Sequence, residues 1–88
     1  MLAHILYSGN VQGVGFRFTA VNIAKQYDIK GWVRNLPGGQ VEILAESTQK
    51  NLDTFRAELE DFFRDNIFDK QVSCKDEKIQ FKDFRIAY

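Results

Sequence analysis

The chain has 88 residues, of which 27% are charged, and its 12 basic side chains balance 12 acidic ones. This length suits one domain with a single modest core, and the zero net charge argues against a nucleic-acid-binding protein, which usually carries a basic excess. Cys74 is the only cysteine, which excludes an internal disulfide, and no run approaches the roughly 20 apolar residues that span a membrane. We therefore expect a single domain over residues 1–88, located in the cytoplasm, with no nucleic-acid or membrane partner.

The first half of the chain predicts a strand, a helix and a hairpin in succession. Side chains of alternating character along residues 3–8 indicate a first strand. Apolar residues then recur at helical spacing from Phe16 to Tyr27, which predicts an amphipathic helix that closes near Asp28. The turn signal Asn35-Leu36-Pro37-Gly38-Gly39 separates two strand-like runs, so we expect a β-hairpin over roughly 31–46.

The second half predicts another helix and two short strands. Either Ser47 or Thr48 is suited to cap the helix, whose apolar stripe comprises Leu52, Phe55, Leu59 and Phe62. Residues 71–74 and 84–88 are typical of short strands, and residues 60–80 give the least clear pattern. The order β-α-β-β-α-β predicts a ferredoxin-like α+β fold, the split β-α-β arrangement, with two helices on one face of an antiparallel sheet. This fold hosts many functions and does not choose among them.

The connection between the first strand and the first helix holds three of the six glycines, Gly9, Gly13 and Gly15. One interpretation is a flexible turn. The other is an anion cradle, in which backbone N–H groups of the loop and of the helix N-terminus surround a phosphate and Arg17 neutralises it. The loop lacks the Gly-Lys-Ser/Thr ending of nucleotide-binding P-loops, and Phe18 occupies the third glycine position of the dinucleotide fingerprint.

Two motifs resemble one known family. Residues 9–17, Gly-Asn-Val-Gln-Gly-Val-Gly-Phe-Arg, are similar to the first signature of the acylphosphatases, and residues 31–35, Gly-Trp-Val-Arg-Asn, are similar to the second. The spacing between the motifs is also similar, and the resemblance covers roughly residues 4–46. Asn10 and Ser47 depart from the usual family pattern, in which a basic residue and a glycine are common.

The resemblance implies a hydrolase that cleaves the carboxyl–phosphate bond of small acyl phosphates without a metal or other cofactor. It implies that Arg17 grips the phosphate and that Asn35 orients the attacking water. The substrate phosphate would lie against a loop that acts mainly through its backbone: Gln12, Gly13, Val14, Gly15, Phe16 and Arg17. The expected partners are the acyl phosphate substrate and inorganic phosphate, and the expected state is a monomer.

Plainer interpretations stay open at this stage. Arg17 could be a surface helix residue, and Asn35 could be a turn residue before Leu36-Pro37. His4 and Cys74 suit an exposed strand position and a small hydrophobe better than a base and a nucleophile. The whole domain could bind an anion without turnover, or, on the same fold, recognise RNA, although the neutral charge argues against RNA. Whether the carboxylate of Tyr88 contacts the site is open.

Overall fold

A computed structural model describes all 88 residues. It contains five strands and two helices, in the order β1 (Leu2–Gly9), α1 (Phe16–Gln26), β2 (Lys30–Asn35), β3 (Val41–Glu46), α2 (Gln49–Phe62), β4 (Ile67–Lys75) and β5 (Phe84–Ile86). Neither helix combines the length and the apolar composition needed to cross a membrane.

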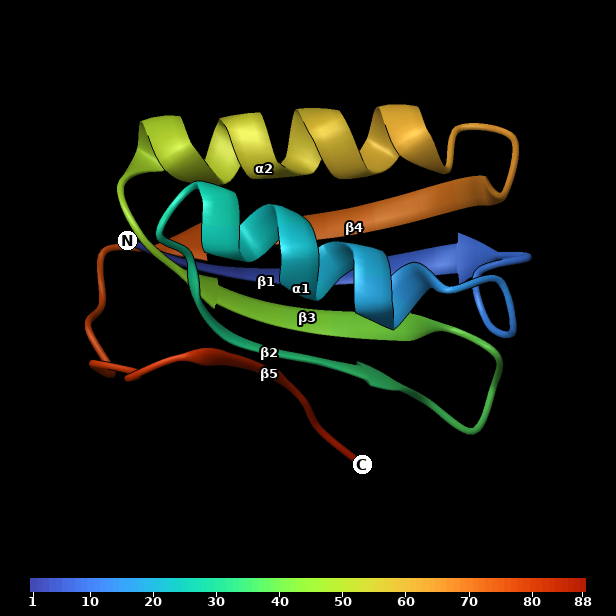
Figure 1. The fold of residues 1–88 in the computed structure, drawn as a ribbon, viewed down its shortest axis with the longest axis horizontal. Coiled ribbons are helices and arrows are strands. Elements are labelled where there is room, and N and C mark those ends of the chain that lie inside the picture. Colours follow the sequence, from blue (N-terminus) through green and yellow to red (C-terminus); the bar gives the residue numbers. More distant parts are fainter.

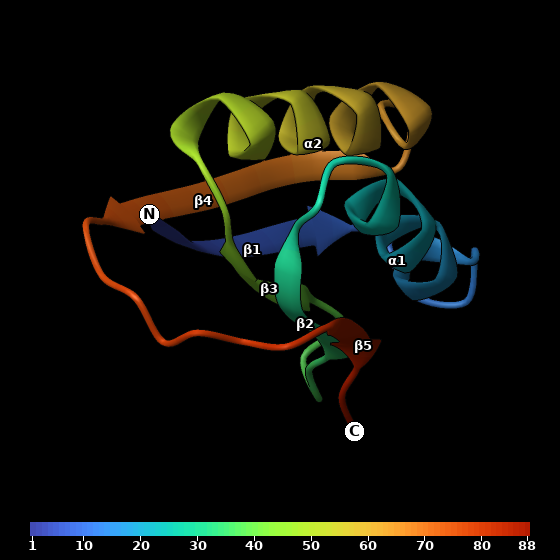
Figure 2. The same cartoon turned by 60° about the vertical axis from the view of Figure 1, so that its left-hand side comes forward.

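The strands form one sheet with the order β4-β1-β3-β2-β5, and both helices cover the same face of it (Figure 1). The pairs β4–β1, β1–β3 and β3–β2 are antiparallel, which confirms the ferredoxin-like α+β fold. The short strand β5 lies beside β2 at the sheet edge (Figure 2). It runs parallel to β2, so the sheet is mixed rather than wholly antiparallel.

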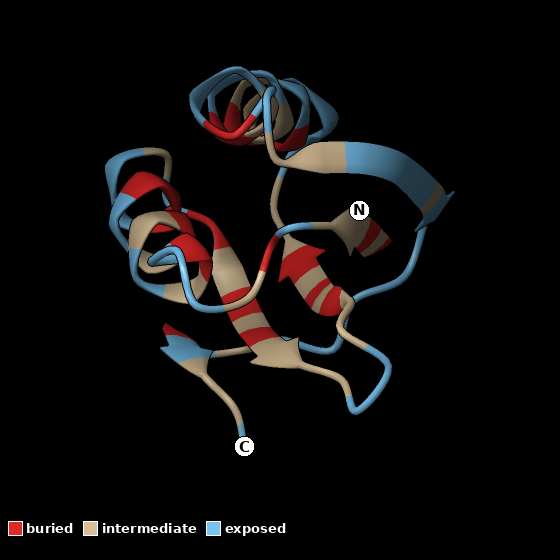
Figure 3. Cartoon of the chain, turned by 90° about the vertical axis from the view of Figure 1, so that its right-hand side faces the viewer, coloured by how far each residue is buried: buried red, intermediate tan, exposed pale blue.

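The core lies between the sheet and the two helices, where the buried parts of the strands and helices face one another (Figure 3). The predicted alternation holds on β1 and β3, because Ala3, Ile5 and Tyr7 are buried beside Ile43 and its neighbours. Burying a large apolar side chain contributes about 1.5–3 kcal/mol relative to leaving it exposed, so this layer fixes the strand register.

The end of α2 corrects one detail of the predicted apolar stripe. Leu52, Phe55 and Leu59 are buried as expected, but Phe62 is 66% exposed and the next residue, Phe63, is buried instead. Phe63 follows Leu59 by four positions, and its ring stacks on Phe16 of α1 with centroids 4.5 Å apart. The contact with α1 therefore decides which of the two adjacent phenylalanines turns inward.

The strand β4 is longer than expected. The sequence predicts a strand over 71–74, whereas β4 extends over nine residues and pairs with β1 along its length. Most of its side chains are exposed because it forms one edge of the sheet (Figure 3). Phe68 of β4, for example, is 71% exposed.

Candidate active site

The loop at residues 10–15 lies at the same end of the sheet as the β2–β3 turn (Figure 1). Gly13 and Gly15 have φ angles of 77° and 81°, in the left-handed region that side chains with a Cβ rarely adopt. The backbone N–H groups of residues 12–15 donate to no acceptor within the protein. The loop therefore offers a row of free donors that continues into the unpaired N–H groups of the first turn of α1.

Arg17 lies in this first helical turn and forms no ion pair. The other four arginines of the chain each pair with a carboxylate: Arg34, Arg56, Arg64 and Arg85. Arg17 instead lies near an aromatic ring, because its Cζ is 5.5 Å from the centroid of the Tyr88 ring. Arg17 is thus a half-buried cation whose charge is not neutralised within the protein.

Asn35 is the last residue of β2 and lies on the helix-covered face of the sheet, in phase with the buried Val33. Its side-chain oxygen Oδ1 is buried and accepts no hydrogen bond. No other side-chain nitrogen or oxygen in the protein is left in this state. Burying an acceptor without a partner destabilises the folded protein by roughly 1–3 kcal/mol. A bound molecule that donates a hydrogen bond to this oxygen would remove that destabilisation.

One cavity of about 160 Å³ brings these features together. Its lining comprises Val11, Gly13, Gly15, Phe16, Arg17, Phe18, Asn35 and Ile86. The two motifs predicted to act together thus meet in space, although they come from different elements. Phe18 and Ile86 also line the cavity, and the sequence did not indicate either of them. For Ile86 the reason is that no local sequence pattern shows which distant loop a C-terminal strand will contact.

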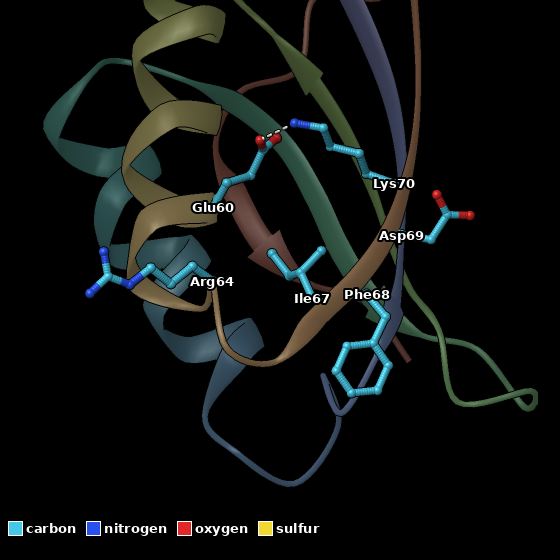
Figure 4. Close-up of a pocket in the computed structure, with 6 residues that line it drawn as sticks. All are labelled: Glu60, Arg64, Ile67, Phe68, Asp69 and Lys70. Carbon is cyan, nitrogen blue, oxygen red and sulfur yellow. Dashed lines mark hydrogen bonds and ion pairs between the residues drawn. The ribbon is translucent and has the colours of Figure 1, made fainter.

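Larger hollows elsewhere do not bring together an unpaired cation, an unpaired acceptor and free backbone N–H groups. The hollow of about 370 Å³ beside α2 and β4 is shown in Figure 4. Its central carboxylate, Glu60, already accepts a hydrogen bond from Lys70 at 2.5 Å and another from Tyr7 at 2.8 Å. The main carboxylate of this hollow is thus already paired, whereas the smaller cavity at Arg17 leaves its cation free.

The side chain of Gln12 has a role that we did not predict. We expected Gln12 to contribute mainly through its backbone, but its Nε2 donates to the carbonyl oxygens of Leu36 at 2.8 Å and Gln40 at 2.9 Å. Both carbonyls belong to the turn that follows Asn35. Gln12 therefore ties the glycine loop to the strand end that carries Asn35, and it sets the spacing between the two halves of the site.

A second pair of hydrogen bonds holds the start of the glycine loop. Asn10 donates its backbone N–H to the carbonyl oxygen of Asn66 at 2.9 Å, and the Asn66 side chain donates to the carbonyl oxygen of Asn10 at 3.0 Å. Asn66 lies in the turn between α2 and β4. The loop is thus anchored at Asn10 and Gln12 while the N–H groups of residues 12–15 stay free, as a preorganised binding loop requires.

The other candidate groups lie outside the cavity. His4 lies 2.6 Å from Glu42, on the sheet face that the helices leave open, and Cys74 is exposed on β4. No group of three or more His, Cys, Asp and Glu side chains is arranged to hold a metal ion. Tyr88 approaches Arg17 with its ring.

The family model of the acylphosphatases matches residues 3–86. The chain belongs to the acylphosphatase family. Curated members of the family from Nostoc sp. and Methanospirillum hungatei are 51% and 55% identical to it over 47 and 51 residues. These matches cover 53% and 58% of this chain but 46% and 56% of the relatives, so the chain spans about half the length of the curated relatives it matches.

Solved structures extend the family likeness to the whole chain. The crystal structure of acylphosphatase from Bacillus subtilis superposes with a TM-score of 0.89 at 32% identity, with all of both chains covered. Full-length HypF in its phosphate- and nucleotide-bound form gives a TM-score of 0.80 at 32% identity, but the match covers only 12% of that chain. The acylphosphatase architecture thus occurs both alone and as a small part of a larger protein.

Proposed function

We propose that the protein hydrolyses the carboxyl–phosphate bond of small acyl phosphates to a carboxylate and inorganic phosphate. In this proposal Arg17 and the 12–17 loop hold the phosphate, and Asn35 orients the water. The observation that carries it is the shared cavity, which is lined both by Asn35, whose buried side-chain oxygen has no partner, and by an arginine without a counterion. Membership of the acylphosphatase family supports the same activity.

The phosphate side of the proposal follows from electrostatics. A guanidinium can donate to two phosphate oxygens at once, and the free N–H groups of residues 12–15 can donate to the remaining oxygens. A cation in the first turn of a helix is unfavourable on its own, because it faces the positive end of the helix dipole. A bound anion removes this repulsion, so the position of Arg17 is favourable only when the cavity is filled.

The water side of the proposal rests on the Asn35 amide. Its free Oδ1 can accept a hydrogen bond from a water, which leaves a lone pair of that water to attack phosphorus. The amide is no base near neutral pH, so it orients the water and does not take its proton. Fixing a nucleophile in line with its target is the main contribution that phosphoryl transfer requires of a protein.

The leaving group explains why no general acid is needed. As the water oxygen bonds to phosphorus, the bond from phosphorus to the acyl oxygen breaks and releases a carboxylate, whose conjugate acid has a pKa of about 4. The proton lost by the water passes to a phosphate oxygen, whose second pKa is about 6. Arg17, Asn35 and the loop can then complete the reaction without a metal, a histidine or a covalent intermediate.

The cavity size bears on the substrate. At about 160 Å³ it is smaller than the 300–1,000 Å³ typical of pockets that enclose a whole drug-sized ligand. We therefore propose that it encloses the phosphate and leaves the acyl group near the opening, with inorganic phosphate as the product that remains bound. The monomeric state and the cytoplasmic location stay predictions.

The direct test is the hydrolysis of benzoyl phosphate in the presence of a chelator. We expect turnover that the chelator does not lower, and inhibition by inorganic phosphate. An Arg17→Ala variant should lose both the rate and the phosphate inhibition, because it removes the one unpaired cation of the cavity. Phosphate binding without turnover by the unmodified protein would instead favour an anion-binding domain, and undiminished phosphate inhibition in the variant would contradict the cradle.

A further inference from the structure

Residues 76–83 cross from one edge of the sheet to the other. They leave β4 at one edge, pass the end of the sheet opposite the glycine loop, and enter β5 at the other edge (Figures 1 and 2). The segment has no regular secondary structure, and it is largely exposed, with Ile79 51% accessible. Its apolar contacts alone therefore hold it weakly.

One carboxylate holds the middle of this crossing segment. Glu46, the last residue of β3, accepts hydrogen bonds from three consecutive backbone N–H groups: Ile79 at 2.5 Å, Gln80 at 3.1 Å and Phe81 at 2.9 Å. Gln80 has a φ of 68°, the left-handed conformation that lets neighbouring N–H groups converge on an anion. These three bonds are the only hydrogen bonds that residues 76–82 form.

The neighbouring charges do not substitute for this contact. Lys30 lies opposite Glu46 in the sheet register but forms its ion pair with Asp28. Lys78 and the amino group of Met1 border the same hollow, yet neither forms an ion pair with the Glu46 carboxylate. The partners of Glu46 are the backbone N–H groups of the segment, so its contribution is specific to the position of that segment.

The segment leads directly to the candidate site. β5 runs parallel to β2, from the end that holds Glu46 toward the end that holds Asn35. It carries Ile86, which lines the cavity, and continues into Tyr88, whose ring faces Arg17. Beyond the three-residue pairing, two backbone bonds to β2 secure the strand. The Gly31 N–H donates to the Asp83 carbonyl at 2.8 Å just before it, and the Ala87 N–H donates to the Val33 carbonyl at 2.9 Å just after it.

We propose that Glu46 is a positioning residue of the active site, which acts by holding the crossing segment so that β5 forms one wall of the phosphate cavity. Its effect is transmitted five residues along the chain, from Phe81 to Ile86, which span about 16 Å when extended. Glu46 touches no substrate atom. This inference rests on the proposed function, because it assigns the wall formed by β5 to the binding of the substrate phosphate.

The test compares Glu46→Gln with Glu42→Gln. Both residues lie on β3 and both substitutions remove one charge, but Glu42 is bonded to His4 and Arg34 and not to the crossing segment. For Glu46→Gln we expect the amide of Ala87 to exchange with solvent at least about 10-fold faster. We expect the KM for benzoyl phosphate and the inhibition constant of phosphate to rise about 3- to 10-fold, with kcat within about 2-fold, since Asn35 keeps its pairing with β3. Glu42→Gln should leave all four values near those of the unmodified protein.

A Glu46→Asp variant covers the case in which Glu46→Gln fails to fold. Its shorter carboxylate reaches fewer of the three N–H groups, so its exchange rate and KM should exceed those of the unmodified protein. Unchanged Ala87 exchange in the Glu46 variants would overturn the proposal, and so would faster exchange with unchanged KM and phosphate inhibition.

A further measurement separates this inference from the proposed function. Phosphate binding is followed by NMR through the amide shifts of Gly13 and Gly15. If the unmodified protein binds phosphate without hydrolysing benzoyl phosphate, the proposed activity fails, yet weaker phosphate binding in Glu46→Gln still supports the positioning role. If the unmodified protein binds no phosphate, both proposals fail.

Discussion

Gln12 joins two parts of the candidate site that the chain places 24 residues apart. Its amide donates to two carbonyls of the β2–β3 turn, and each carbonyl also accepts a backbone N–H, from Gly39 and from Leu36. The turn therefore keeps its own hydrogen bonds if the Gln12 amide is removed. What is lost is the fixed distance between the glycine loop and Asn35.

We expect Gln12→Ala to lower kcat for benzoyl phosphate by about 10-fold or more and to change phosphate inhibition much less. The reason is that a displacement of about 1 Å between a nucleophile and its target can cost about 100-fold in rate, whereas the N–H groups and Arg17 still bind the anion. Steady-state kinetics measure both values. Gln40→Ala is the matched control, because the Gln40 amide lies in the same turn but donates to Ser8 on β1. An equal loss in the control would show that the effect is general loosening of the turn.

At the residue scale, the sequence predicts Arg17, which carries the charge, and Asn35, which carries the free acceptor. It does not predict the contacts of Gln12 and Ile86, which surround these two residues. Arg17 and Asn35 can be predicted because each lies in a short, local sequence motif, and the fold places the two motifs at the same end of the sheet. The hydrogen bonds of Gln12 to the β2–β3 turn and the place of Ile86 in the cavity lining could not be predicted. Each joins segments far apart in the chain, and neither has a local sequence pattern.

At the scale of the elements, the start of α2 is fixed by a single cap. The sequence leaves Ser47 and Thr48 as alternatives, and Thr48 is the cap: it has an extended backbone, and its side chain accepts the N–H of Asn51 at 3.1 Å. Ser47 instead accepts a hydrogen bond from the Asn51 side chain at 3.2 Å.

Thr48→Ala should therefore lower the free energy of unfolding by about 1 kcal/mol, the usual cost of losing an N-cap, and Thr48→Asp should retain most of it. Urea denaturation followed by circular dichroism measures the difference. Ser47→Ala should cost clearly less, because its hydroxyl does not satisfy a helix N–H. A larger loss for Ser47→Ala than for Thr48→Ala would contradict the assignment of the cap.

The elements that the sequence predicts least well are those at the sheet edges. Along β1 and β3 one face is buried, so apolar side chains alternate and the strands are visible. Along β4 most side chains meet solvent, so the pattern that would reveal nine strand residues is absent. The parallel direction of β5 depends on where the crossing segment leads, which local sequence does not encode.

At the scale of the whole molecule, paired carboxylates add polar links between elements that also share the core. Glu60 of α2 accepts a hydrogen bond from Lys70 of β4 (Figure 4) and another from Tyr7 of β1. Burial tends to raise the pKa of Glu60, but the bonds from Lys70 and Tyr7 and the charge of Arg56 outweigh it and bring this pKa below its usual value. The pKa of Glu46 is lowered as well, chiefly by the N–H of Gln80.

These lowered pKa values predict a loss of stability in acid. A carboxyl whose pKa is lower in the folded state binds fewer protons there than in the unfolded chain. It therefore stabilises the fold above the usual glutamate pKa of about 4.3, and this stabilisation disappears as the pH falls through the pKa of the folded state. We expect the free energy of unfolding to decline below about pH 5, and to decline less steeply in Glu60→Gln. Urea denaturation over a pH series measures both, and equal slopes in the two proteins would show that Glu60 does not contribute.

The central claim is that one cavity divides the work between a phosphate-binding arginine and a water-orienting asparagine. The most direct test is the kinetics of Asn35→Ala with benzoyl phosphate and inorganic phosphate. We expect kcat to fall by about 100-fold or more while the phosphate inhibition constant stays within about 3-fold, because Arg17 and the loop N–H groups still bind the anion. Turnover equal to that of the unmodified protein, or a loss of phosphate inhibition in proportion to the loss of rate, would contradict this division.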